Sequence, residues 1–145
     1  MSKIKVLFLC TGNSARSQMA EAFLRQHAGE QFDAFSAGLE PSDINPFTRR
    51  VMNEMGLDLK GQYSKSVTEY LGKANFGYLI TVCASAEKNC PRTFPGISQC
   101  QHWDFEDPAA FVGSEVETLE KFRAVRDQID AKVQSWIAEQ HIVVS

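Results

Sequence analysis

The chain has 145 residues, 43% of them hydrophobic, which is enough to build the core of one domain. Its 15 basic and 18 acidic residues give a net charge of −3. This is not the excess of positive charge that is typical of proteins binding nucleic acids or anionic membranes. The apolar runs are too short to span a bilayer, and no signal peptide is recognisable. We therefore expect one domain over residues 1–145 in the reducing cytoplasm, where static disulfides are disfavoured.

The N-terminal half of the chain alternates between strand and helix patterns. Apolar residues 4–9 indicate a buried strand, and residues 16–27 carry the spacing of an amphipathic helix. Residues 32–37 indicate a second strand. Residues 45–56 predict a second helix, with an N-cap asparagine, a first-turn proline and a terminal glycine.

The C-terminal half continues this alternation. A capping-box pattern opens a short helix over residues 66–72, and residues 76–83 and 99–105 indicate two further strands. A second capping box, Ser114 with Glu117, precedes a long amphipathic helix. The pattern predicts an α/β fold with a four-stranded parallel sheet and helices on both faces. The apolar stripe expected on the last helix is Leu119, Phe122, Val125, Ile129, Val133, Trp136 and Ile137.

The segment between the first strand and the first helix has the composition of an anion-binding loop. It reads Cys10-Thr11-Gly12-Asn13-Ser14-Ala15-Arg16-Ser17. At the start of a helix, unpaired N–H groups and the positive end of the helix dipole favour an anion. A loop curled around its own amides forms a nest for a tetrahedral oxyanion, and the arginine adds a planar fork with two donors.

Cys10 is the candidate nucleophile of this loop. A thiol at a helix N-terminus beside Arg16 is expected to have a lowered pKa and to react as a thiolate. Ser17 can favour the thiolate further by donating a hydrogen bond. The alternative is that Cys10 is a small core residue at a strand end. Because Gly12, Asn13, Arg16 and Ser17 follow it at these spacings, we interpret Cys10 as a nucleophile.

Cys83 and Cys90 form a second candidate group, seven residues apart. If the intervening segment were helical, their Cα atoms would stand about 10 Å apart, beyond the reach of a disulfide. The pair can bond only if the segment unwinds, which its Ser85, Asn89 and Pro91 permit. The alternative is two unrelated buried thiols.

A zinc site is another conceivable use of the cysteines. Cys90, Cys100 and His102 carry metal-ligating groups, but their spacing matches no usual zinc pattern, so no metal site is expected. Cys100 is interpreted as a packing residue of the fourth strand. Asp107, held by the following Pro108 in a loop after that strand, is a candidate general acid.

These motifs together resemble a known family. The stretch 10–21, with Ser36-Ala37-Gly38 and Asp107-Pro108, resembles the low-molecular-weight protein tyrosine phosphatase fold. With Cys83, Cys90 and the pair His102-Trp103 added, the chain is similar to the arsenate reductases built on that fold, and looks closest to the thioredoxin-coupled branch. The resemblance extends over nearly the whole chain.

The resemblance implies a three-cysteine relay. Cys10 would attack the arsenic of arsenate, held by Arg16 and the amides of residues 11–17, while Asp107 helps water to leave. Cys83 would then attack Cys10 and release arsenite. Cys90 would attack Cys83, and thioredoxin would reduce the resulting Cys83–Cys90 disulfide. The substrate-binding residues implied are Thr11, Gly12, Asn13, Ser14, Ala15, Arg16 and Ser17.

The resemblance also bears on cofactors and partners. No tightly bound cofactor is expected. Members of the branch can bind a potassium ion through residues matching Asn13, Glu21, Ser36 and a small hydroxyl residue near position 63, so the resemblance makes potassium a candidate ligand here. At that position this chain has Tyr63 followed by Ser64. The partners implied are arsenate, with phosphate or sulfate as mimics, and thioredoxin. We expect a monomer that binds neither nucleic acid nor membrane.

Three alternatives stay open at this point. A low-molecular-weight tyrosine phosphatase needs Cys10, Arg16 and Asp107 but neither of the other two relay cysteines. Such phosphatases often carry tyrosines where this chain has Ala109-Ala110-Phe111. An arsenate reductase coupled to a low-molecular-weight thiol and a glutaredoxin-type partner would not require Cys90. A non-enzymatic redox sensor would bind the anion without turnover.

Overall fold

The chain folds around a four-stranded parallel sheet. The computed structural model describes residues 3–59, 61–70, 76–82 and 99–144. The sheet order is β2-β1-β3-β4, with every neighbouring pair parallel. The single α/β architecture with a four-stranded parallel sheet confirms the predicted fold class. The strands are β1 (Ile4–Cys10), β2 (Phe32–Gly38), β3 (Tyr78–Thr81) and β4 (Gln99–His102).

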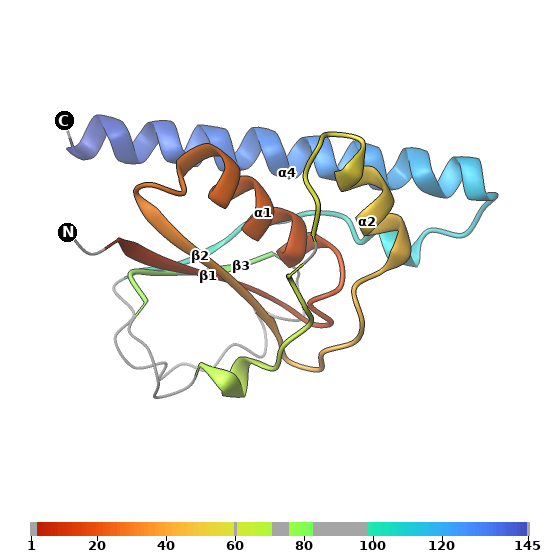
Figure 1. The fold of residues 1–145 in the computed structure, drawn as a ribbon, viewed down its shortest axis with the longest axis horizontal. Coiled ribbons are helices and arrows are strands. Elements are labelled where there is room, and N and C mark those ends of the chain that lie inside the picture. The colour runs from red at the N-terminus through yellow and green to blue at the C-terminus, as the bar shows by residue number, and fades with distance from the viewer. Residues whose placement is uncertain (1–2, 60, 71–75, 83–98, 145) are drawn as a thin grey trace.

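The three α-helices of the described residues cover one face of this sheet. Figure 1 shows α1 (Arg16–Ala28), α2 (Pro46–Asn53) and α4 (Glu115–Val144) on the same side, with α4 running along the whole length of the domain. Helix α1 packs against both β1 and α4, and α2 packs against α4. The short 3-10 turn η1 (Val67–Glu69) lies on the other side of the sheet (Figure 1). In the part of the chain that the structure describes, no helix is long and apolar enough to cross a membrane.

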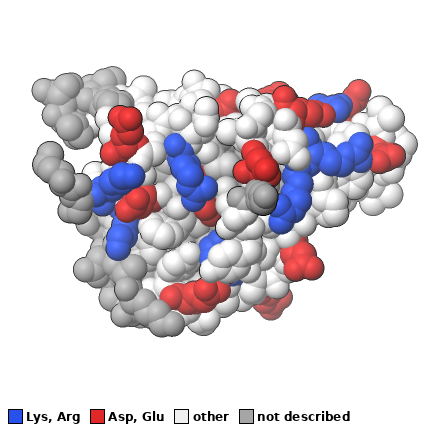
Figure 2. All heavy atoms as spheres, viewed as in Figure 1, with Lys and Arg blue, Asp and Glu red and all other residues white. Residues whose placement is uncertain are grey.

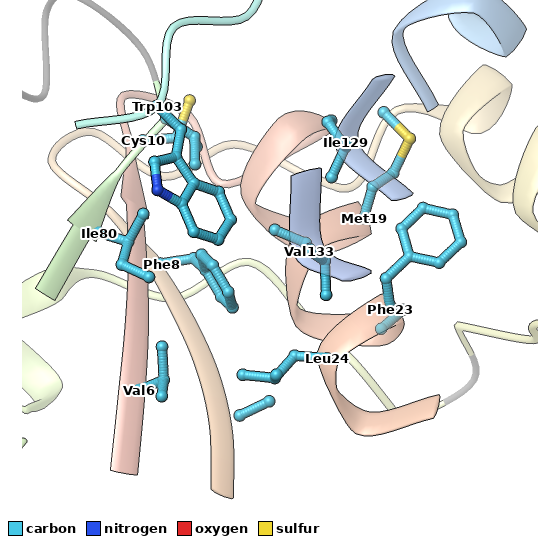
Figure 3. Packing of buried hydrophobic residues seen from close by; sticks show 14 of the residues in the cluster. Val6, Phe8, Cys10, Met19, Phe23, Leu24, Ile80, Trp103, Ile129 and Val133 are labelled. Atoms are coloured by element: carbon cyan, nitrogen blue, oxygen red, sulfur yellow. The ribbon is translucent and has the colours of Figure 1, made fainter. Parts of the chain in front are cut away.

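The core lies between the sheet and this helical layer. Strand β1 is central, and its residues from Val6 to Cys10 are all buried, because neighbouring strands flank it and side-chain layers cover it. Figure 3 shows Phe8 of β1 beside Trp103, facing Val133 of α4 and the α1 side chains Met19, Phe23 and Leu24. The apolar stripe predicted for the last helix is buried along its whole length, from Leu119 to Ile137. That prediction is confirmed.

The capping signals at Asn45 and Ser114 were accurate, whereas Ser66 caps its turn by accepting from the N–H of Thr68 and not of Glu69, and several element ends differ. Asn45 accepts a hydrogen bond from the N–H of Phe47 at 2.8 Å, and Ser114 and Glu117 form a reciprocal capping box. Helix α2 ends at Asn53, before the predicted Gly56, which has a φ of +74°. The expected short helix after Ser66 is a single 3-10 turn in the described part of the chain. The spacing of apolar residues predicts whether a segment is a helix or a strand better than it predicts the residue at which the element ends.

Charges of both signs are mixed on the surface. Figure 2 shows lysines and arginines interspersed with acidic residues on the face in view. Glu54, at the C-terminal end of α2, pairs with two arginines of α4. Its carboxylate accepts from Arg123 at 2.6–3.1 Å and from Arg126 at 2.9 Å, so it ties α2 to α4.

The Glu54 contacts predict a loss of stability in acid. The hydrogen bond from Arg123 is the main cause that lowers the pKa of Glu54 from 4.5 to about 2. Because the unfolded state takes up this proton first, the stabilisation is complete above pH 4.5 and is lost as the pH falls toward 2. Urea unfolding of Glu54→Gln should therefore show a smaller loss of stability between about pH 5 and about pH 2.5 than the wild type. A Glu139→Gln variant, at an exposed position of α4, should follow the wild type; equal slopes for all three proteins would contradict the prediction.

Candidate active site

The loop after β1 is held by hydrogen bonds to its outward-facing carbonyls. Each backbone carbonyl oxygen of residues 10–14 accepts at least one hydrogen bond, at distances of 2.8–3.2 Å. The donors are the backbone N–H groups of Leu39, Glu40, Ser42 and Asn45, and the side chains of Gln18, Thr48 and Ser64. Segments that follow β2 and precede η1 therefore fix the loop on its outer side.

These outward carbonyls orient the amides to the inner side of the loop. In a planar trans peptide the C=O and the following N–H point in opposite directions. The N–H groups of residues 11–15 therefore face away from the anchored side. Helix α1 begins directly afterwards at Arg16, and the side chain of its N-cap residue, Ala15, makes no capping hydrogen bond. The inner side thus collects backbone donors and the positive end of a helix dipole, which is the arrangement that binds an oxyanion.

Arg16 contributes a buried donor to the same place. Its Nη1 donates to the carbonyl oxygen of Phe105 at 3.1 Å, and its Nη2 lies 3.5 Å from Asp107 Oδ2. Its Nε is buried and has no hydrogen-bond partner among the described residues. A buried guanidinium donor without a partner is costly unless a ligand satisfies it. The structure brings the predicted pair of Arg16 and Asp107 together, although the two residues are far apart in the sequence.

Asp107 is positioned by the turn that follows it. Its Oδ1 accepts from the N–H of Ala109 at 3.0 Å and so caps the 3-10 turn η2 (Pro108–Ala110). The second carboxylate oxygen is left to face Arg16, and the side chain keeps 44% of its exposure. A carboxylate that is both oriented and accessible to water is suited to proton transfer at the loop.

Asn13 fastens the middle of the loop. It adopts a left-handed φ of +51°, which asparagine tolerates better than most residues, and it is fully buried. Its Nδ2 donates to Ser17 Oγ at 2.8 Å, and its Oδ1 accepts from the N–H of Lys65 at 2.9 Å. Because Ser17 Oγ accepts this hydrogen bond, its own proton can be directed to another acceptor, in keeping with the predicted hydrogen bond to the Cys10 thiolate.

Gly38 allows the end of β2 to approach this loop. A Cβ at this position would lie 2.6 Å from the Thr11 carbonyl oxygen and 3.0 Å from the Asn13 nitrogen, both of which are backbone atoms. We expect Gly38→Ala to lower the free energy of unfolding by roughly 1–3 kcal/mol and to weaken phosphate binding, because the loop must shift. Urea unfolding and calorimetric titration with phosphate would measure both effects.

Gly56→Ala is the matched control for that substitution. Gly56 has a φ of +74°, and no described atom lies within 4 Å of the position that a Cβ would take. Alanine there costs about 1 kcal/mol of backbone strain alone. It should lose stability without changing the phosphate affinity. Equal phosphate affinities for the Gly38 variant and the wild type would contradict the role given to Gly38.

Of the three relay cysteines, only Cys10 lies among the residues that the structure describes. Cys10 ends β1 and is buried as a member of the core cluster (Figure 3). Cys83 and Cys90 lie outside the described residues, so their predicted roles stay predictions. The neighbouring Val82 donates its N–H to the Leu9 carbonyl oxygen at 3.0 Å, and so lies beside the end of β1.

Strand β4 departs from the prediction made for its cysteine. Cys100 is exposed, so its interpretation as a packing residue was wrong. Strand β4 lies at the edge of the described sheet, next to β3. A side chain on an edge strand is buried only where another element packs over it, and the sequence of the strand does not tell whether one does. The Nδ1 of His102, the last residue of this strand, lies 2.7 Å from Thr81 Oγ1 on β3. Among the described side chains, no group of three or more potential metal ligands lies together.

A charged cluster lies behind the loop: Glu21, Ser36 and Lys65 are buried, and Arg25 pairs with Glu21 from a half-exposed position. The resemblance placed Glu21 and Ser36 together, but no sequence pattern pointed to Lys65. Glu21 Oε1 accepts from Ser36 Oγ at 2.5 Å and lies 3.9 Å from Lys65 Nζ, while Oε2 is paired with Arg25. Glu21 and Lys65 each keep only 5% of their exposure. No local pattern identifies Lys65, since Glu21 and Asn13, which it contacts, are distant in sequence.

The geometry defines a class of protein: an α/β domain with a cysteine at the C-terminal end of a central strand and an oxyanion-binding loop leading into a helix. The family model of the low molecular weight phosphotyrosine protein phosphatases matches residues 5–142. The chain belongs to this family.

Particular relatives refine the comparison. The chain is 42% identical over 135 residues to the arsenate reductase of Oceanobacillus iheyensis, covering 92% of this chain and 95% of that one. The structure of an arsenate reductase in the phosphate binding state is 32% identical, has a TM-score of 0.78, and covers 94% of this chain and 98% of that one. A thioredoxin-dependent arsenate reductase from Corynebacterium glutamicum is 27% identical with a TM-score of 0.64, covering 91% of this chain and 62% of that one.

Proposed function

We propose that this protein is an arsenate reductase that uses Cys10, Cys83 and Cys90 in turn and thioredoxin as its reductant. The observation that carries the proposal is the loop after Cys10, whose outward-anchored carbonyls leave the amides of residues 11–15 facing inward and whose Arg16 keeps a buried Nε without a partner among the described residues. Arsenate is a tetrahedral oxyanion that fits such a set of donors. The relatives at about 40% identity are arsenate reductases.

In the first step the Cys10 thiolate forms a bond to arsenic and an oxygen leaves as water. Asp107, oriented by the Ala109 N–H, supplies the proton for this leaving oxygen. Arg16 and the loop amides balance the negative charge of the remaining oxygens. The oxidation state of arsenic does not change in this step.

In the second step the Cys83 thiolate attacks the sulfur of Cys10. The arsenic–sulfur bond breaks and its electron pair stays on arsenic, so arsenate is reduced to arsenite and the two sulfurs are oxidised to a disulfide. Cys90 then attacks Cys83 and releases the Cys10 thiolate. Thioredoxin reduces the Cys83–Cys90 disulfide. The position of Val82 beside Leu9 supports a path by which the chain leads from β3 toward Cys10.

A phosphatase is the second candidate, because the family model describes phosphotyrosine phosphatases. Cys10, Arg16 and Asp107 suffice for that reaction, and arsenate and phosphate share shape and charge. The segment after Asp107 favours the reductase, since Ala109-Ala110-Phe111 stands where phosphatases often carry tyrosines, and its two alanines are exposed.

The two candidates are separated by following NADPH oxidation with arsenate, thioredoxin and thioredoxin reductase. We expect arsenate-dependent oxidation that is lost in Cys90→Ser and kept in Cys100→Ser, whose thiol lies exposed on β4. Activity that survives in Cys90→Ser and requires glutathione and glutaredoxin would assign the other thiol system. Hydrolysis of aryl phosphates without arsenate reduction would assign the phosphatase, and oxyanion binding without any turnover would assign a sensor.

A further inference from the structure

The residues implied for potassium binding do lie together, but a lysine ammonium stands among them. Lys65 Nζ donates to the carbonyl oxygen of Tyr63 at 2.8 Å and lies 3.9 Å from Glu21 Oε1. It also lies 4.6 Å from the centre of the Tyr63 ring. Lys65 is almost completely buried, so this charge is a fixed part of the interior and not a solvated surface group.

The oxygens that would bind potassium are already hydrogen-bonded to the protein. Asn13 Oδ1 accepts from the Lys65 N–H, and the Tyr63 carbonyl accepts from both Gln18 and Lys65. Glu21 accepts from Ser36 and pairs with Arg25. A potassium ion needs several oxygens to replace its hydration shell. The residues present therefore do not fit a bound potassium ion.

The two hydroxyl groups near position 63 are also directed elsewhere. Tyr63 is 57% exposed, and its hydroxyl lies 3.5 Å from Glu69 Oε1, away from the cluster. Ser64 Oγ donates to the carbonyl oxygen of Asn13 at 2.8 Å. Neither hydroxyl supplies the ligand that the resemblance implies. A second monovalent cation would also meet the positive charge of the buried Lys65 ammonium at short range.

We propose that the Lys65 ammonium is a built-in cation that replaces a bound potassium ion and positions the anion-binding loop, so that anion binding in this protein does not depend on potassium. Few contacts separate Lys65 from the anion-binding loop. The side chain of Lys65 holds Glu21 and the Tyr63 carbonyl, while its backbone N–H holds Asn13 and its backbone C=O accepts from Gly38 at 2.7 Å. Asn13 and Gly38 both support the loop.

Burial and nearby carboxylates act in opposite directions on the charge of Lys65. Burial lowers the pKa of Lys65 below its ordinary value, and the carboxylates of Glu21 and Glu69 oppose that effect by raising it. Folding brings the lysine ammonium into place, so no free cation has to be taken from solution. Lys65 is therefore a positioning residue, which acts on the anion through Asn13 and Gly38.

The test measures phosphate affinity and thermal stability in potassium chloride and in choline chloride at equal ionic strength. The inference rests on the anion-binding part of the proposed function, and phosphate binding is read without any redox step, so failure of the relay leaves it standing. The wild type should differ less than twofold in phosphate affinity between the two salts. A tenfold or larger dependence of the wild type on potassium would overturn the proposal, and this measurement needs no variant.

Substitutions of Lys65 separate its charge from its volume. Lys65→Ala opens space at the carboxylate of Glu21 and should lose at least tenfold in phosphate affinity in choline chloride, with recovery in potassium chloride. Lys65→Met fills the space without a charge and should show the loss without the recovery. Lys3→Ala, at an exposed lysine paired with Asp33, should behave as the wild type in both salts. Full phosphate affinity of Lys65→Met in choline chloride would overturn the proposal, as would a Lys65→Ala variant that potassium does not rescue.

Discussion

A Cys10→Ser variant should lose arsenate-dependent NADPH oxidation by at least about 1,000-fold and still bind phosphate. A serine hydroxyl is not ionised near neutral pH and forms no disulfide, so both the attack on arsenic and the transfer to Cys83 fail. The anion donors are unaffected, because the carbonyls of the loop stay anchored from outside. The coupled assay measures the first effect, and calorimetric titration with phosphate measures the second.

Cys100→Ser provides the comparison for a thiol outside the site, since Cys100 is exposed on the edge strand. It should keep the activity of the wild type. Residual activity of Cys10→Ser within tenfold of the wild type would show that Cys10 is not the nucleophile. Loss of phosphate binding together with activity would instead show that the substitution had disturbed the loop.

Arg16→Lys should reduce kcat/KM for arsenate roughly 100-fold, which corresponds to about 3 kcal/mol. Lysine keeps the positive charge but loses the planar fork, so it cannot hold the Phe105 carbonyl, the Asp107 carboxylate and the anion at the same time. Phosphate affinity should fall along with kcat/KM, because the same donors hold both oxyanions. Steady-state kinetics and calorimetry on one preparation would check this.

Arg49→Lys is the matched control, since Arg49 lies exposed on α2. It should change neither quantity by more than twofold. An Arg16→Lys variant with near-normal kcat/KM would rule out a specific role for the guanidinium fork and leave only its charge.

Much of the fold follows from local patterns that need no knowledge of tertiary contacts. The apolar run before Cys10 and the polar segment after it define a strand, a loop and a helix, and these appear as β1 and α1 within one residue of their expected ends. The boundaries of β3 and β4 were harder to predict, because pairing with a neighbour ends them at Thr81 and His102 before the apolar pattern stops. The Cys100 prediction failed for a related reason, since exposure at a sheet edge depends on what covers that edge.

The anion-binding loop, its cysteine and its arginine could be predicted from the residues alone, because one short segment between a strand end and a helix start carries all of these groups. The same reading singled out Asp107 as a candidate. Its position 3.5 Å from Arg16, and that of Lys65 beside Glu21, emerged only in the folded chain. Both contacts join segments far apart in the sequence, and the free energy that sets them comes from burial and pairing of charges, which no local pattern encodes.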